Sequence, residues 1–169
     1  MSDIDEFRGR YFFLSNYAPL KHPVPFEGLE YPTSEAAYQA AKSHSTAVRN
    51  AIRSCASPCA AKAMGRSLTV RPGWEDEKRD TMLTVVRAKF DANPDLAQRL
   101  VQTGKARLIE GNRWGDRVYG CVRDPTTGQW VGENCLGRIL EQVRDEHARR
   151  VDDDGVSSTS TSRSTQQAQ

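Results

Sequence analysis

The sequence lacks any apolar run long enough to cross a bilayer, and its N-terminus lacks the apolar segment of a signal peptide. We therefore expect a soluble, cytoplasmic protein that has no membrane partner. An excess of one charge is also missing, because 24 lysines and arginines stand against 22 acidic residues and leave a net charge of +2. A balance this small does not by itself indicate a nucleic-acid binder.

Clustered metal ligands are absent as well. The four cysteines form no C-x-x-C pair, and the three histidines are scattered along the chain. Because zinc needs ligands at set spacings, we expect free thiols, no metal and no other cofactor. The chain also has no Walker loop, no G-x-G-x-x-G after a strand, no G-x-S-x-G and no H-E-x-x-H. A cysteine–histidine nucleophile pair stays open as an alternative that nothing in the chain favours.

What is present suits a single domain. At 169 residues the chain can bury a sizeable core, and helix and strand signals fill residues 1–150. From Val151 the composition changes to Asp, Ser, Thr and Gln with almost no apolar residues, so residues 151–169 are predicted to form a disordered polar tail. The signals within residues 1–150 predict an α+β fold that is mainly helical and has a small β-sheet.

Capping residues, prolines and glycines mark the expected elements. They predict helices that begin after Thr33 or Ser34, after Ser45 or Thr46, at Pro58 (ending at Gly65), at Glu75, at Pro94 (ending at Gly104) and after Asn134. Aromatic residues predict a strand or short hairpin in 4–17, and two prolines make 21–27 an edge segment or loop. Further strands are predicted at 106–109 and 118–122, with a hairpin turn at 124–128.

The stretch 28–42, GLEYPTSEAAYQAAK, is the most informative part of the chain. Helical spacing gathers a carboxylate, a phenol, an amide and an amine on one stripe: Glu35, Tyr38, Gln39 and Lys42. Two interpretations stay open, a solvated surface face and a functional site. Glu35 and Lys42 are seven residues apart, outside the i,i+4 register that supports exposed helices, which argues against the first interpretation.

Other polar and aromatic residues lie next to turns and can converge with this stripe. They are Asn16, Trp74, Trp114, Asp116, Tyr119 and Asn134. Each has a simpler interpretation when taken alone: a tryptophan is more often core, an aspartate in a glycine-rich turn forms an Asx-turn, and an asparagine before a helix caps it. It is their combination that points to a site.

Several segments in fixed order carry a resemblance: FRGRYFFLSNY, GLEYPTSEAAYQAAK, AAKAMGR, Trp74, EGNRWGDRVYG and GENCLGRIL. Through them, residues 4–144 resemble the NADAR family, whose name refers to NAD and ADP-ribose. The resemblance implies a YbiA-like fold and an N-glycosidase that acts on a ribosyl group. For some members it implies removal of ADP-ribose from guanine, which reverses a toxin's modification of nucleic acid. For others it implies cleavage of ribosylamino-pyrimidine phosphate intermediates of riboflavin synthesis.

The resemblance also assigns residues. The family's motif glutamate corresponds to Glu35, its motif lysine to Lys42 and the aromatic residue before its long helix to Trp74. Its N-x-W-G-D and G-x-N-x-L-G segments correspond to Asn112, Trp114, Asp116 and Asn134. Where the family commonly has Phe-Trp-Gly, this chain has Val118-Tyr119-Gly120, so Tyr119 offers a smaller ring with a hydroxyl.

These residues suggest a mechanism. We expect Glu35 to stabilise an oxocarbenium-like state and Asp116 to orient water or a ribose hydroxyl. Lys42 would bind phosphate or attack the opened sugar as an amine. Trp74 and Tyr119 would stack on a base. The other expected substrate-binding residues are Asn16, Tyr38, Asn112, Trp114, Asn134, Arg10 and Arg66, with Arg71 as a further candidate for the diphosphate.

The E-G-N-x-W-G-D form is closer to the ADP-ribose branch of the family. The sequence therefore predicts an N-glycosidase that removes ADP-ribose from guanine, with an ADP-ribosylated nucleotide or nucleic acid as substrate and an ADP-ribosylating toxin as cognate partner. One alternative is an N-glycosidase of riboflavin intermediates. The other is a non-catalytic ADP-ribose or nucleotide binding module.

Overall fold

Two long helices form the frame of the molecule. In the computed structural model, which describes residues 2–160, α4 (Trp74–Ala92) packs against α6 (Cys135–Ser160). The short helix α5 (Pro94–Val101) follows α4 and also packs on α6. None of the described helices is both long and apolar enough to span a membrane.

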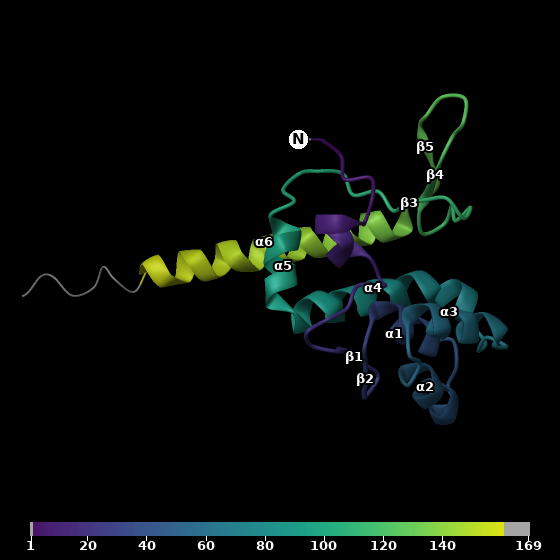
Figure 1. Ribbon diagram of the computed structural model, residues 1–169. Helices are drawn as coiled ribbons and strands as arrows, with labels where there is room; N and C mark the ends of the chain where they lie inside the picture. Colours follow the sequence, from purple (N-terminus) through teal and green to yellow (C-terminus); the bar gives the residue numbers. More distant parts are fainter. Residues whose placement is uncertain (1, 161–169) are drawn as a thin grey trace, which may run out of the picture.

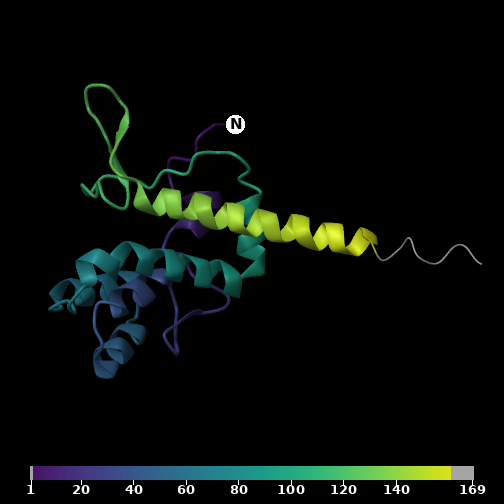
Figure 2. The ribbon, with the colours of Figure 1, turned by 180° about the vertical axis from the view of Figure 1, so that it is seen from behind.

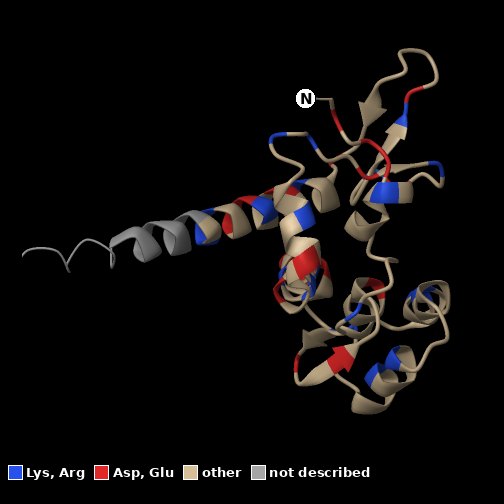
Figure 3. Ribbon diagram, turned by 60° about the vertical axis from the view of Figure 1, so that its left-hand side comes forward, with Lys and Arg blue, Asp and Glu red and all other residues tan. Residues whose placement is uncertain are grey.

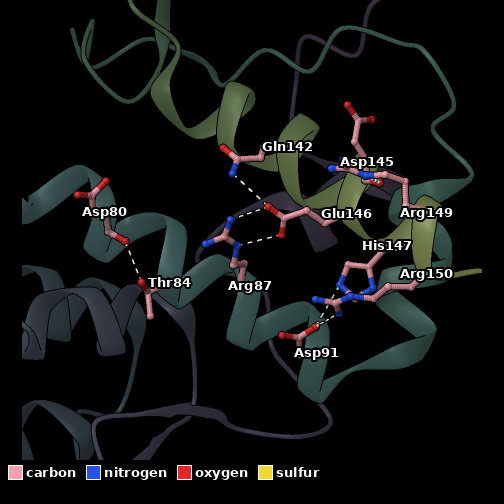
Figure 4. Close-up of polar contacts among 10 residues, drawn as sticks. All are labelled: Asp80, Thr84, Arg87, Asp91, Gln142, Asp145, Glu146, His147, Arg149 and Arg150. Carbon is pink, nitrogen blue, oxygen red and sulfur yellow. Dashed lines mark hydrogen bonds and ion pairs between the residues drawn. The ribbon is translucent and has the colours of Figure 1, made fainter.

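Ion pairs tie the outer part of this frame together. The Arg87 guanidinium makes two hydrogen bonds to the Glu146 carboxylate, at 2.9 and 2.6 Å (Figure 4). Farther along, Arg150 and His147 both approach Asp91, with the Arg150 Nη1–Asp91 Oδ1 distance at 2.7 Å. Basic and acidic residues are interspersed along the part of α6 whose side chains are described, residues 135–151 (Figure 3).

The helix α1 (Ser34–Ala40) lies at the centre of the other half. It contacts α2 (Thr46–Arg53), α3 (Pro58–Ser67), α4 and the hairpin of β1 (Val24–Phe26) and β2 (Leu29–Tyr31). All of its residues are buried, including Glu35, Tyr38 and Gln39. The interpretation of its polar stripe as a solvated face is therefore wrong.

Three of the predicted helix starts are confirmed in detail. Thr33 Oγ1 accepts a hydrogen bond from the Ala36 amide, Ser45 Oγ from that of Val48, and Ser57 Oγ from that of Ala60. Each oxygen satisfies one of the amides that a helix leaves unpaired in its first turn. The order of helices predicted from the sequence is the order observed.

The strands are shorter than predicted. β1 and β2 pair antiparallel, which confirms the edge segment at 21–27. In the second sheet, β3 (Gly111–Asn112) pairs parallel with β4 (Cys121–Arg123), and β4 pairs antiparallel with β5 (Trp130–Val131) across the turn predicted at 124–128. The β4–β5 hairpin projects beyond the start of α6 (Figures 1 and 2). The strand predicted at 106–109 is reduced to a single bridge between Ile4 and Leu108.

Three predictions are corrected by tertiary contacts. Residues 9–14 form a 3-10 helix, η1 (Gly9–Leu14), rather than a strand or hairpin, and the Lys89 ammonium binds the carbonyls at its end. Helix α3 does not stop at Gly65 but continues to Ser67. Helix α1 ends at Ala40, so Lys42 lies just beyond it. In the first two cases tertiary contacts, of Lys89 with η1 and of Gly65 with Gln39, overrode local propensity.

The C-terminal boundary also differs. Helix α6 continues past Val151 to Ser160, so the first part of the predicted disordered tail is helical. Once a helix is nucleated and packed, each added residue gains a hydrogen bond, so it can extend beyond its last apolar contact. The rest of that predicted tail, residues 161–169, lies outside the described residues.

Candidate active site

A cavity of about 830 Å³ opens between the two halves of the fold. Its walls come from residues 7–17 around η1, from α1 and α3, from Met82 on α4 and Leu136 on α6, and from residues 110–119, called here the loop 110–119, which begin with β3. The cavity gathers most of the residues that the sequence suggested: Asn16, Glu35, Tyr38, Lys42, Arg66, Trp114, Asp116 and Tyr119. Four others, Arg10, Trp74, Asn112 and Asn134, do not line it.

Glu35 is the acidic group of the α1 wall. Glu35 is only 6% exposed, and Gln39 Nε2 donates a 2.7 Å hydrogen bond to Glu35 Oε1. Burial raises the pKa of this carboxyl, while the Gln39 amide and the nearby Lys62 and Lys42 pull that pKa down. The site thus holds a desolvated carboxylate that is compensated by one amide and surrounding cations.

Gln39 owes its position to a glycine on the neighbouring helix. A Cβ atom at Gly65 would lie 1.9 Å from Gln39 Oε1. Only glycine allows α3 to approach α1 this closely. This close approach explains why Gly65 occurs inside α3 and not at its end.

Lys42 reaches the cavity from the segment after α1. Arg71 fixes this segment, since its amide donates to the Lys42 carbonyl at 2.8 Å and its Nε donates to the Ala41 carbonyl at 2.9 Å. Burial lowers the pKa of Lys42, and Glu35 opposes that effect. Arg71 itself does not line the cavity, so it supports the segment that carries Lys42.

Two tyrosines link α1 to the loop 110–119. The hydroxyls of Tyr38 and Tyr119 lie 2.7 Å apart, and their rings meet edge to face. Trp74 packs behind Tyr38, with ring centroids 5.2 Å apart, and is only 3% exposed. The structure therefore corrects the expectation for Trp74, which is a core residue behind the wall and offers no free face for a base.

The loop 110–119 is shaped by Asn112. This buried side chain donates to the carbonyls of Asp116 (2.7 Å) and Cys121 (3.0 Å) and accepts from the Asp116 amide. Asp116 Oδ1 in turn accepts from the amides of Val118 and Tyr119, both at 2.9 Å. Asp116 lines the cavity, yet one of its oxygens is engaged in the turn, as the simpler interpretation predicted. Trp114 is 60% exposed at the cavity.

Asn134 organises the same loop from behind. Its Oδ1 accepts from the Glu110 amide at 3.0 Å, and its Nδ2 donates to the Leu108 carbonyl at 2.8 Å. It therefore joins α6 to the strand region instead of capping the helix with its side chain or binding a substrate. Asn134 takes a left-handed backbone conformation, with φ at 53°, which asparagine tolerates better than most residues.

Arg10 also falls outside the cavity, and its guanidinium lies over the Tyr11 ring. Sequence reasoning missed several lining residues, among them Arg8, Phe12, Tyr17, Lys62 and Glu110. Two of these had a usable signal. Lys62 precedes Arg66 by four residues, one turn along the same helix, and Glu110 is the first letter of the EGNRWGD segment.

A buried lysine holds the turn that carries Asn16. Lys89 Nζ donates to the carbonyls of Phe13 (2.6 Å) and Ser15 (3.0 Å), and burial lowers its pKa to about 7. The Asn16 carbonyl then accepts from the Glu35 amide at 3.1 Å. A chain of contacts thus connects α4, through this turn, to the first turn of α1.

Among the residues that the structure describes, no cluster of His, Cys, Asp and Glu could hold a metal ion.

These features coincide with a known family. The profile of the NADAR domain family matches residues 5–147. The chain belongs to the NADAR family. A solved structure of the Escherichia coli protein YbiA, determined by NMR, has the same fold as this NADAR domain, with a TM-score of 0.72 and 33% identity. The match covers 89% of this chain and 88% of that one.

Curated relatives of this NADAR domain carry informative names. "N-glycosidase YbiA" of E. coli K12 is 34% identical over 140 residues, which cover 79% of this chain and 80% of that protein. A riboflavin biosynthesis protein of Vibrio vulnificus is 31% identical over 140 residues, which cover 79% of this chain but only 35% of that protein. The N-glycosidase names support a glycosyl hydrolase activity for the chain described here.

Proposed function

We propose that this protein is an N-glycosidase that hydrolyses the bond between ribosyl C1′ and a base nitrogen, and that its substrate is ADP-ribose attached to guanine. The observation that carries this proposal is the buried Glu35 carboxylate, held by Gln39 at the wall of a cavity lined by cations and aromatic rings. Cleavage of a ribosyl C–N bond passes through an oxocarbenium-like state, which such a carboxylate stabilises.

The charges of the cavity support a phosphorylated substrate. Arg8, Lys42, Lys62 and Arg66 all line it, and they can neutralise a diphosphate. Lys42 also has a lowered pKa, which leaves open its second predicted role as an amine nucleophile on the opened sugar. Its position beside the Tyr38 ring, with Nζ 5.9 Å from the ring centre, keeps it next to the α1 wall.

The size of the cavity favours ADP-ribose over a mononucleotide. Ligand pockets usually span about 300–1,000 Å³, and 830 Å³ lies in the upper part of that range. The exposed Trp114 ring and Tyr119 both line the cavity, and in this proposal they contact the base. In this proposal the base is guanine in nucleic acid modified by an ADP-ribosylating toxin, and the activity reverses that modification as a repair or antitoxin function.

A riboflavin intermediate remains the second candidate, because the name of the Vibrio vulnificus relative places that protein in riboflavin biosynthesis. The two substrates are distinguished by incubating the protein with a guanine-ADP-ribosylated oligonucleotide and, separately, with ribosylamino-pyrimidine phosphates, while cleavage of the ribosyl C1′–N bond in each is followed. Release of free ADP-ribose, with unmodified guanine left in the oligonucleotide, supports the first proposal. Release from the pyrimidine substrate alone would replace it with the second.

Glu35→Gln separates an enzyme from a binding module. The substitution keeps the shape of the side chain and removes its charge, so turnover should fall by about 10²–10⁴ while most substrate binding is kept. Glu30→Gln is the matched control, since Glu30 is an exposed glutamate on β2. Full turnover in the Glu35 variant would refute its role, and binding without turnover in the wild type would indicate a reader.

A further inference from the structure

Glu110 is a second acidic side chain in the cavity, and the mechanism above does not use it. It lines the cavity together with Glu35 and Asp116. Its Oε2 is buried and accepts no hydrogen bond from any residue that the structure describes. A carboxylate oxygen that is buried without a donor is costly in the ionised state, so this environment favours the neutral acid.

The backbone of Glu110 is fixed on both sides. Its amide donates to Asn134 Oδ1 at 3.0 Å, and its carbonyl accepts from the Cys121 amide at 2.9 Å. Gly120 packs so closely that a Cβ there would lie 2.3 Å from the Glu110 carbonyl oxygen. A side chain on a backbone held in this way is presented at the cavity without a mobile loop to move it.

Burial raises the pKa of both carboxyl groups, but the surroundings of Glu35 and Glu110 differ. Glu35 has the Gln39 amide as a donor and cations nearby, which oppose the effect of burial on its pKa. Glu110 has no such donor, and burial raises its pKa to about 7. The charges of Asp116 and Glu35 raise this pKa further, while Lys62 and Lys89 lower it. Two carboxyl groups whose environments separate them in this way divide acid and base roles between them.

We propose that Glu110 is the general acid of the reaction: its carboxyl proton is transferred to the leaving nitrogen as the C1′–N bond breaks. This inference rests on the proposed N-glycosidase function. The electron pair of the broken bond stays on the base nitrogen, which takes the proton, and Glu110 becomes a carboxylate. Water then forms the new bond to C1′ and its proton passes to the Glu35 carboxylate. Exchange with solvent returns both groups to their starting forms.

The test compares Glu110→Gln with the wild type and with Glu30→Gln on guanine-ADP-ribosylated oligonucleotide. In the wild type, kcat should fall as pH rises through about 7, because the acid loses its proton. In Glu110→Gln, kcat should be lower by about 10²–10⁴ and that basic limb should be absent, while KM changes less. Glu30→Gln should keep the wild-type profile.

A second substrate separates proton donation from a structural role. NAD⁺ carries the same ADP-ribosyl group on a pyridinium nitrogen, which leaves as neutral nicotinamide and needs no proton. Glu110→Gln should therefore retain nicotinamide release to within about tenfold, which also shows that the variant is folded. If the wild type releases no nicotinamide, two other measurements on the variant distinguish proton donation from a structural role. Proton donation predicts the loss of the basic limb together with an unchanged melting temperature.

The outcomes distinguish a wrong role for Glu110 from a wrong N-glycosidase function. An unchanged kcat, a basic limb that persists in Glu110→Gln, or an equal loss on both substrates would overturn the role of Glu110 and leave the N-glycosidase function in place. Wild-type protein that cleaves no N-riboside would overturn the proposed function, and the role of Glu110 would fall with it.

Discussion

Replacing Gly65 with alanine tests whether the contact between α3 and α1 controls the candidate active site. The new Cβ would lie 1.9 Å from Gln39 Oε1 and 2.7 Å from Gln39 Cδ, far inside contact distance. Gln39 is only 3% exposed, so its side chain has little free space to move into. The amide must leave the position from which it donates to Glu35.

The size of the effect follows from three contributions. Overpacking a dense core costs about 1–3 kcal/mol, and loss of a hydrogen bond to a charged group costs about 1.5–3 kcal/mol. The better helix propensity of alanine offsets up to about 1 kcal/mol. We therefore expect Gly65→Ala to lower the free energy of unfolding by roughly 1.5–6 kcal/mol. Without its amide donor the pKa of Glu35 should also rise, and the acidic limb of the pH–activity profile should move to higher pH.

The assay is urea unfolding of Gly65→Ala, Gln39→Ala and the double variant, together with the pH profile of each. In the Gln39→Ala background the closest contact is gone and only the 2.9 Å approach to Gln39 Cβ remains, so Gly65→Ala should cost much less. Equal costs in both backgrounds, or a stabilised Gly65→Ala, would refute the reasoning. An acidic limb that does not move would show that Gln39 does not set the charge state of Glu35.

Three further predictions concern other groups. Lys89→Met removes the donor to the carbonyls of Phe13 and Ser15 and should cost about 2–4 kcal/mol in urea unfolding; a cost below about 1 kcal/mol would contradict the role given to those bonds. Trp114→Ala should leave the melting temperature unchanged and weaken binding of the substrate base by about 1–3 kcal/mol in a titration, and unaltered affinity would exclude stacking. Glu110 keeps its proton up to a pH of about 7 in the folded protein, whereas in the unfolded chain it loses the proton at its ordinary pKa of 4.5. Its contribution to stability therefore falls as pH rises between these two values. Glu110→Gln should gain stability relative to the wild type over the same window, and parallel pH–stability curves would contradict the pKa given to this group.

Local signals were enough to predict the helices, because each helix start is determined by a few adjacent residues. Thr33, Ser45 and Ser57 cap the helices that follow them, and each bond spans only three residues. The same holds for the turn at 124–128, where Asp124 accepts from amides two and three residues away. Such information is local, so one sequence is sufficient to read it.

The errors concern residues whose conformation depends on distant partners. The strand predicted within 4–17 follows from aromatic propensity, but Lys89, more than seventy positions away, binds the end of a 3-10 helix instead. Gly65 has the signature of a helix end, and only its contact with Gln39 explains why the helix continues. Trp74 was predicted to be a base-stacking ring because it lies beside a turn, and its burial behind Tyr38 depends on tertiary packing.

The candidate site was predictable where the chemistry lies on α1 and less so where it lies on the loop. Helical spacing singled out Glu35, Tyr38 and Lys42, the family resemblance pointed to Glu35 and Lys42 as well, and all three line one cavity. The sequence marks Glu110 only as the first residue of the EGNRWGD segment and gives no sign of its burial. Its raised pKa arises from burial and from charges on separate segments, which only the folded chain brings near it.

The packing of α1 against several elements has a consequence for how the site can change. A helix in contact with α2, α3, α4 and a β-hairpin can accept few substitutions and cannot shift to suit a new ligand. Arg113 and Trp114, in contrast, are exposed, so substitutions there disturb little packing. A change at Trp114 should therefore alter the accepted base while the fold and the buried carboxyl groups stay in place.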